Sequence, residues 1–323
     1  MKTTAPSTLT TPTGLHHVTA IASEPQANIN FYAGLLGLRM VKKTVNFDDP
    51  SAYHLYYGDE TGSAGTIVTF FYWPGLGGRG RVGPGQMTRI SFSVAPASLP
   101  FWQARLEKHG EAVTATRRFG EDVLTFQDPD RIPVELVAVE NDARIGWTGS
   151  NIPAANVIRG LHTAELTVRR AQETEPLLTG EMGYRLVKRD GERARFEAGP
   201  GGSGHYVDVI ASADQPHGLG GVGTIHHIAW SVPDDETQLT MQEILTEAGY
   251  HVSDVRDRDY FHSIYYREHA GILFEIATVN PGFPVDEPAA TLGTTLRLPT
   301  QFQHARAQIE KSLPTLAPAQ RYD

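Results

Sequence analysis

Two histidine pairs and one glutamate are the residues of this chain whose types and spacing could hold a metal ion. The pairs His16-His17 and His226-His227 each stand in a short alternating apolar stretch, and Glu275 stands in a similar stretch later in the chain. Two histidines and one carboxylate that meet at one site form the triad that binds non-haem Fe(II) and leaves coordination positions open. The 323 residues include no cysteine, so a metal site here must use histidine and carboxylate ligands.

A single histidine in a strand is more often a hydrogen-bonded structural group than a ligand, so the case for a metal depends on repeated positions. The sequence repeats four times, with a period of roughly 70 residues. Each repeat opens with a strand pattern, continues into an amphipathic helix and returns to strands. The opening strands are predicted at 14–20, 87–94, 160–166 and 224–230, the helices at 27–36, 99–109, 171–179 and 236–248, and the closing strands at 65–70, 132–136, 205–209 and 271–276.

Each predicted helix stops at a glycine, as expected where a left-handed cap ends a helix. These glycines are Gly37, Gly110, Gly183 and Gly249. We therefore predict an α+β protein of four βαβββ modules, which pair to form two curved mixed or antiparallel sheets. The predicted divisions are an N-terminal domain over 14–145 with modules 1 and 2, a C-terminal domain over 158–282 with modules 3 and 4, and a tail over 283–323 with a helical stretch at 301–312.

Overlaying the four modules brings polar residues to two shared positions, one in the opening strand and one in the closing strand. These are His17 and Thr69 in module 1, Arg89 and Glu135 in module 2, Thr163 and Asp208 in module 3, and His227 and Glu275 in module 4. Pairing modules 1 and 4 would place His17, His227 and Glu275 in one cup. Pairing modules 3 and 4 would leave one histidine there, so we favour modules 1 with 4 and 2 with 3.

The first histidine of each pair has two open interpretations. Strand alternation points His16 and His226 away from the face that carries His17 and His227. They would then be surface or inter-sheet polar groups. A bulge could instead turn either ring toward the site.

The composition is typical of a globular protein, and its charge balance disfavours the binding of polyanions. There are 28 Lys and Arg against 37 Asp and Glu, which gives a net charge of -9 without a basic tract. This balance disfavours nucleic acid and anionic membrane surfaces as partners. Residues 1–13 lack the apolar core of a secretory signal, and no run approaches the roughly 18 apolar residues of a membrane-spanning helix. We expect a cytoplasmic protein, and exposed module edges would allow a homodimer.

The motifs at these positions resemble those of the vicinal oxygen chelate superfamily, which includes glyoxalase I, bleomycin-resistance proteins and extradiol dioxygenases. The segments 15–19, 53–57, 225–227, 258–265 and 271–275 are similar to those of the four-module hydroquinone ring-cleaving dioxygenases. This resemblance implies that His17, His227 and Glu275 hold iron. It also implies that Tyr265 and Arg258 lie beside the metal, with Thr19, His16 and His226 near the substrate pocket.

The resemblance implies an Fe(II)-dependent, extradiol-type dioxygenase that opens the ring of hydroquinone- or catechol-like diols with O2. Mn(II) would suit the same ligands. Tyr265 would orient or protonate oxygen, Arg258 would stabilise anionic charge, and His226 would transfer a proton. The alternatives are that Tyr265 only packs across strands and that Arg258 belongs to a solvated charged turn.

Two other function classes compete with this one. A glyoxalase I-like lyase or isomerase would use Zn(II) or Ni(II) with a fourth protein ligand. The fourth position here is Thr69, a poor ligand, which favours an oxygen-using centre. A non-catalytic protein that binds aromatic compounds or antibiotics would need no triad at all.

Overall fold

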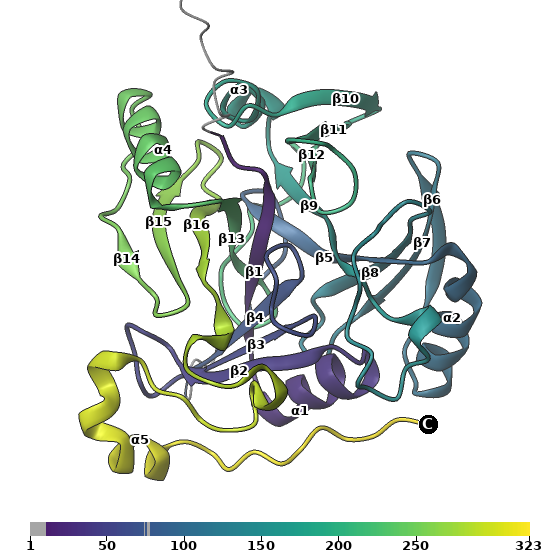
Figure 1. Ribbon diagram of the computed structural model, residues 1–323. Coiled ribbons are helices and arrows are strands. Elements are labelled where there is room, and N and C mark those ends of the chain that lie inside the picture. Colours follow the sequence, from purple (N-terminus) through teal and green to yellow (C-terminus); the bar gives the residue numbers. More distant parts are fainter. Residues whose placement is uncertain (1–10, 74, 76–77) are drawn as a thin grey trace, which may run out of the picture.

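The computed structural model describes residues 11–73, 75 and 78–323 and contains two curved eight-stranded sheets (Figure 1). The expectation about residues 1–13 therefore falls largely outside the described part of the chain. The two sheets lie against each other through their central strands, since β13 is next to β5 and β1 is next to β9.

The first sheet combines modules 1 and 4, as predicted. Its strand order is β14-β15-β16-β13-β1-β4-β3-β2. Module 1 supplies β1 (Gly14–Ala22), β2 (Arg39–Val45), β3 (Tyr53–Gly58) and β4 (Ile67–Tyr72), and module 4 supplies β13 (Ile225–Val232), β14 (Arg256–Asp257), β15 (Phe261–Arg267) and β16 (Leu273–Pro281). The opening strands β1 and β13 pair antiparallel at the centre, and each also pairs in parallel with the closing strand of its own module.

The second sheet combines modules 2 and 3 in the same way. Its order is β10-β11-β12-β9-β5-β8-β7-β6. Module 2 supplies β5 (Gln86–Val94), β6 (Thr114–Arg118), β7 (Glu121–Gln127) and β8 (Pro133–Ala138), and module 3 supplies β9 (Gly160–Val168), β10 (Arg185–Asp190), β11 (Arg193–Glu197) and β12 (Tyr206–Ala211). The α+β fold of four βαβββ modules and both module pairings are therefore confirmed. The division into domains at 14–145 and 158–282 stays a prediction.

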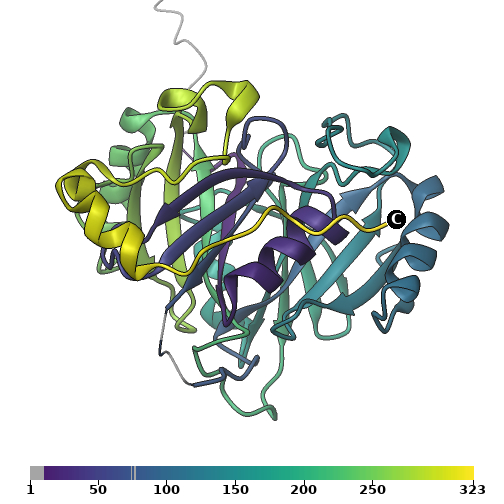
Figure 2. The same cartoon turned by 90° about the horizontal axis from the view of Figure 1, so that it is seen from below.

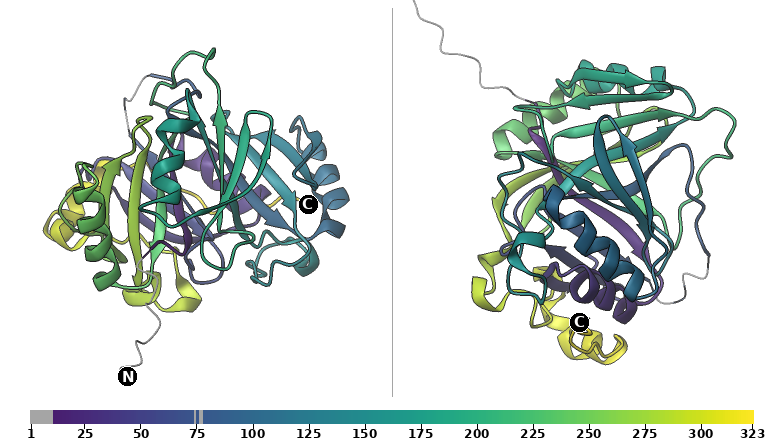
Figure 3. Two further views of the ribbon diagram at one scale, coloured as in Figure 1. Left: turned by 90° about the horizontal axis from the view of Figure 1, so that it is seen from above. Right: turned by 90° about the vertical axis from the view of Figure 1, so that its right-hand side faces the viewer.

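Each module carries one helix after its opening strand. These are α1 (Pro25–Ile29), α2 (Leu99–Lys108), α3 (Glu175–Thr179) and α4 (Asp235–Glu247). All four predicted capping glycines have positive φ angles, between 68° and 91°. Helices α1 and α2 lie side by side (Figure 3), where Arg105 donates to the carbonyl of Leu35.

Two helices differ from the predicted ranges. After α1 the chain continues as a π-helix over Asn30–Leu35, whose wider turn leaves Phe31, Tyr32 and Leu35 all buried. The third predicted helix divides into a short 3-10 turn, Ala171–Glu173, followed by α3. Pro176 stands in the first turn of α3, where its missing N–H costs no helical hydrogen bond.

The C-terminal segment wraps around modules 1 and 2. Its predicted helical stretch is a 3-10 helix over Thr300–Ala305 followed by α5 (Arg306–Ser312). The chain then runs along α1 toward α2 (Figure 2), where the Tyr322 carbonyl accepts a hydrogen bond from Arg105. Within the described residues, no helix is both long and apolar enough to cross a membrane.

Candidate metal centre

Three buried side chains converge at the middle of the first sheet: His17 on β1, His227 on β13 and Glu275 on β16. Oε2 of Glu275 lies 3.3 Å from Nε2 of His17 and 3.0 Å from Nε2 of His227. The three ligand atoms all lie within 4.8 Å of one another. Such an arrangement allows all three atoms to contact one ion.

Strand register explains why residues so far apart in sequence meet. In the β1–β13 pair, His17 faces Ala229 and Thr19 faces His227, so the two halves are related by an approximate two-fold axis. Glu275 pairs with Ala229, and Thr69 pairs with Thr19. Thr69 is therefore the counterpart of Glu275, as the overlay of the modules predicted.

The preceding histidines lie in two equivalent bulges. The β1–β13 register shifts at His16 and again at His226, so neither residue has a cross-strand partner. His16 Nδ1 lies 2.8 Å from His17 Nδ1, and His226 Nδ1 lies 2.7 Å from His227 Nδ1. Because each inner histidine uses Nδ1 in this way, its Nε2 is left to face a metal. Both outer histidines thus contact the inner ones at bulges, but only His226 also lines the cavity beside the triad.

The protonation states of the site favour metal binding. Burial alone would raise the pKa of Glu275, but His17 and His227 hold that pKa well below its ordinary value. Burial lowers the pKa of His227 by more than the neighbouring Glu275 raises it. An ionised carboxylate, as in Glu275, and a neutral imidazole, as in His227, are the forms that bind metals.

The two carboxylate oxygens of Glu275 differ in their hydrogen bonding. Oε1 accepts a hydrogen bond from Ser263, whereas Oε2 is buried without a hydrogen-bond partner among the described residues. A buried carboxylate oxygen without a partner is costly unless a cation meets it. The residues present therefore fit a metal ion.

The triad forms part of the wall of a cavity of about 310 Å³. Its apolar walls include Phe47, Phe71, Trp73, Phe261 and Leu273. A mostly apolar cavity with a few convergent polar groups is typical of a site for a small organic molecule.

Of the residues predicted around the metal, three line this cavity: Tyr265, Arg258 and His226. The Tyr265 ring lies 6.0 Å from the His227 ring, and its hydroxyl accepts a hydrogen bond of 3.2 Å from Arg258 Nε. Arg258 also pairs with Asp48 at 3.1 Å, which joins module 4 to a loop of module 1. His226 is exposed, in contrast to the buried His227.

The structure places neither His16 nor Thr19 in the cavity wall. The buried His16 ring turns toward Phe261, at 5.0 Å between ring centroids, and borders a separate hollow. Thr19 is buried, and its hydroxyl oxygen lies 2.8 Å from that of Thr69, which is also outside the cavity wall. Thr69 in turn lies 2.8 Å from Nε2 of His54, which lines the cavity, so Thr19 reaches the cavity wall only through these two hydrogen bonds.

Two cavity residues, His54 and Tyr56, were absent from the predicted site. His54 Nδ1 lies 2.8 Å from the Tyr56 hydroxyl, and His54 Nε2 lies 2.8 Å from Thr69 Oγ1. Strand alternation over 53–57 puts residues 54 and 56 on one face. That signal could have placed this pair on the side of the strand that faces the triad of His17, His227 and Glu275.

The comparisons with known proteins agree with this geometry. The family model of the glyoxalase/bleomycin resistance protein/dioxygenase superfamily matches residues 14–136 and 160–276. The chain belongs to this superfamily. The resemblance drawn from the sequence motifs is therefore confirmed.

Within this superfamily, the chain is similar over nearly its whole length to relatives that are named as ring-cleaving dioxygenases. The chain is 45% identical to MhqO of Bacillus subtilis, which is named provisionally as a ring-cleaving dioxygenase. The alignment spans 302 residues and covers 93% of this chain and 95% of MhqO. The chain is 32% identical over 307 residues, with 93% and 95% covered, to the chlorohydroquinone/hydroquinone 1,2-dioxygenase of Sphingobium indicum.

A solved Bacillus subtilis structure, provisionally called a dioxygenase, superposes with a TM-score of 0.92 at 43% identity and covers 96% of this chain and 99% of its own. Glyoxalase I from Zea mays superposes with a TM-score of 0.63 at 12% identity, covering 82% of this chain and 92% of its own. The second likeness shows the fold alone.

Proposed function

We propose that this protein is an Fe(II)-dependent, extradiol-type dioxygenase that opens the ring of hydroquinone- or catechol-like diols with O2. The observation that carries the proposal is a three-ligand site in the wall of an apolar cavity, with Thr69 at the fourth equivalent position. The names of the relatives, which include ring-cleaving and hydroquinone dioxygenases, support it. We place this activity in the cytoplasm, in a chain that can form a homodimer.

His17, His227 and Glu275 would hold the ion. Their mixed nitrogen and oxygen donors suit Fe(II), and Mn(II) as well. When bound, iron would supply redox chemistry toward O2 and a Lewis-acidic contact for one phenol oxygen. A glyoxalase-like Zn(II) or Ni(II) centre is less well supported, because Thr69 is hydrogen-bonded to Thr19 and His54 and offers no fourth ligand.

The surrounding side chains divide the remaining work. Burial and Glu275 raise the pKa of Tyr265, so its hydroxyl stays protonated and can donate at Oη. Because that oxygen already accepts from Arg258, the proton is left available to substrate oxygen. The Arg258 guanidinium places a fixed positive charge at the cavity wall, which favours a phenolate. The exposed His226, whose pKa desolvation and His227 lower to about 3, would act as a neutral imidazole that carries a proton between the cavity and solvent.

The apolar walls hold and dehydrate the ring. Phe71 lies 4.8 Å from Trp73 and 6.3 Å from the metal-facing His227, measured between ring centroids. Water excluded by such walls strengthens the electrostatic contacts inside the cavity.

The proposal is tested by O2 uptake of anaerobically purified, Fe(II)-loaded protein with a panel of hydroquinones and catechols. We expect one O2 consumed per diol, with a ring-opened acid as product. Absence of uptake with every diol, despite a measured bound metal, would contradict the proposal. It would favour a lyase assay with Zn(II) or Ni(II).

A further inference from the structure

The two-fold relation within the first sheet extends beyond the metal ligands. Tyr56 on β3 pairs with Thr69, and Tyr265 on β15 pairs with Glu275. Since Thr69 and Glu275 are counterparts, Tyr56 is the counterpart of Tyr265. Both tyrosines line the cavity.

The partners of the two closing-strand residues differ in a complementary way. In module 4, the short Ser263 donates to the long Glu275. In module 1, the equivalent strand position is His54, whose long side chain reaches the short Thr69 at 2.8 Å. The module 4 side of the cavity thus carries a carboxylate, and the module 1 side carries the uncharged pair of His54 and Thr69 at the equivalent positions.

The module 1 side holds a series of hydrogen bonds that ends at Tyr56. It runs from Thr19 through Thr69 and His54 to the Tyr56 hydroxyl, with each step 2.8 Å long. Burial, followed by His17 and His227, lowers the pKa of His54 well below its ordinary value, so the ring carries one N–H and one acceptor nitrogen.

Whichever way the hydrogen bonds of this series run, the Tyr56 hydroxyl can form one more hydrogen bond. If Tyr56 donates to His54, its oxygen can accept a hydrogen bond from a ligand. If His54 donates instead, the Tyr56 O–H is free to donate. The hydroxyl can therefore match a ligand oxygen of either kind without a change in charge.

Packing fixes the position of Tyr56. Its ring contacts Phe283 of the C-terminal segment at 5.1 Å and the His54 ring at 4.0 Å. Burial, followed by Tyr265 and Glu275, raises the pKa of the Tyr56 hydroxyl well above its ordinary value, so the hydroxyl stays protonated. The phenol is thus buried and rigid within the same cavity as Glu275.

We propose that Tyr56, oriented by His54, binds the second hydroxyl of a para-diol, the hydroxyl that cannot reach the metal. This inference rests on the proposed function and names the residues that would select para-diols within it. A catechol could direct both adjacent oxygens to the metal. A hydroquinone can offer only one, so its opposite hydroxyl needs a partner elsewhere in the cavity.

The test compares two phenols bound to the Fe(II)-loaded protein without O2, measured by equilibrium dialysis. Hydroquinone carries the second hydroxyl, whereas in 4-methylphenol a methyl group replaces it. We expect wild-type protein to bind hydroquinone about tenfold more tightly, the effect of one buried hydrogen bond. In Tyr56→Phe this ratio should fall to about one.

Two further variants separate the subsite from general packing. His54→Phe keeps a ring but removes the partner of Tyr56, so the ratio should fall there too. The matched control is Tyr57→Phe on the same strand, whose hydroxyl bonds Asn28 at 2.9 Å and should leave the ratio unchanged.

The outcomes distinguish this inference from the proposed function. A ratio that stays near its wild-type value in both Tyr56→Phe and His54→Phe, or a wild-type ratio of one, would overturn the subsite alone. Failure of metal-loaded wild-type protein to bind either phenol would overturn the proposed function together with this inference.

Discussion

The two sheets use the same strand positions for opposite purposes. In the first sheet these positions hold two histidines, a glutamate and a threonine around a cavity. In the second sheet the equivalent positions hold an arginine, two carboxylates and a threonine, namely Arg89, Glu135, Asp208 and Thr163. The backbone arrangement is shared, so the side chains alone decide which sheet could bind a metal.

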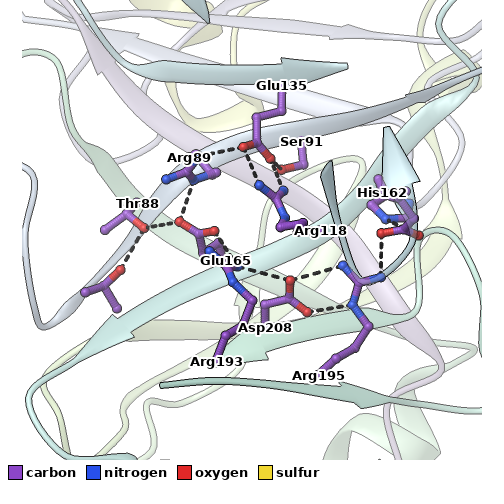
Figure 4. Close-up of polar contacts among 12 residues, drawn as sticks. Thr88, Arg89, Ser91, Arg118, Glu135, His162, Glu165, Arg193, Arg195 and Asp208 are labelled. Atoms are coloured by element: carbon purple, nitrogen blue, oxygen red, sulfur yellow. Dashed lines mark hydrogen bonds and ion pairs between the residues drawn. The ribbon is translucent and has the colours of Figure 1, made fainter. Parts of the chain in front are cut away.

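Arginines fill the cup of the second sheet (Figure 4). Arg89 bridges Glu135 and Glu165, Arg118 pairs with Glu135, Arg193 pairs with Glu165 and Asp208, and Arg195 pairs with Asp208 and Glu121. Burial would raise the pKa of Glu135, but Arg118 and Arg89 hold it at about 2.

The decisive difference lies in the carboxylate oxygens. Both oxygens of Glu135 accept hydrogen bonds from arginine, and Ser91 also donates to one of them. In Glu275, Oε2 has no hydrogen-bond partner among the residues described. A buried carboxylate oxygen that faces two imidazole nitrogens and no arginine distinguishes a candidate metal site from a structural ion-pair cluster.

The largest effect is expected from removing a ligand in the first sheet. His227→Ala should lower metal affinity by more than about 100-fold and abolish activity, because one of three ligands is lost. Metal content after dialysis and the far-ultraviolet circular dichroism spectrum would be measured together. Full activity with retained metal in this variant would refute the assigned site.

Removing a carboxylate from the second sheet should affect stability instead. Glu135→Gln leaves Arg89 and Arg118 without their shared charge partner, so we expect a loss of about 3 kcal/mol in the free energy of unfolding. Urea denaturation measures it, with metal content as the control. A loss of metal at unchanged stability would reverse the roles assigned to the two sheets.

Two serines that donate to the two glutamates offer a matched pair. Ser263→Ala removes the donor to Glu275 and should weaken metal binding by about tenfold, as expected when the group that orients a ligand is removed. Ser91→Ala removes the donor to Glu135 and should lower stability by about 1 kcal/mol without changing metal affinity. Equal metal affinities in the two variants would count against the distinction.

Asp128 shows a third way to accommodate a buried carboxylate, with neither a metal nor an arginine. Burial raises its pKa to about 7, while its oxygens accept from Tyr32 and from the N–H groups of Asp130 and Ile132. The folded protein therefore keeps this proton to higher pH than the unfolded chain does. The free energy of unfolding consequently falls as pH rises from about 4 to about 7. Because the pKa rises from 3.8 to about 7, and each tenfold change in proton affinity corresponds to about 1.4 kcal/mol, Asp128→Asn should remove this fall and be more stable than wild type by about 4 kcal/mol at pH 8.

The measurement is the free energy of unfolding of both proteins between pH 4 and pH 8. Near pH 4 the two should be similar, because Asp128 is protonated in the folded state there. An equal difference at both ends of the range would exclude a titrating Asp128 as its cause.

Local signals in the sequence were sufficient for the modules, their pairing and the proposed ligands. Alternation marked the opening strands, the glycines marked the helix ends, and only modules 1 and 4 carry histidine at the shared position. The bulges at His16 and His226 were left open, because a bulge depends on how β1 and β13 align across more than 200 intervening residues.

Features formed by several strands were beyond the sequence. Arg89 and Glu135 stood out in the overlay, but Arg118, Arg193 and Arg195 reach the same cup from β6 and β11. The partnership of Thr69 with His54 likewise depends on cross-strand packing, which hydrophobic patterns do not encode.

Anomalous diffraction at the iron absorption edge, from crystals grown anaerobically with Fe(II), tests the contrast between the sheets most directly. We predict one iron peak per chain in the first sheet, between Nε2 of His17, Nε2 of His227 and the Glu275 carboxylate, and none in the cup of the second sheet. A peak among the carboxylates of the second sheet, or none at the triad, would contradict this account.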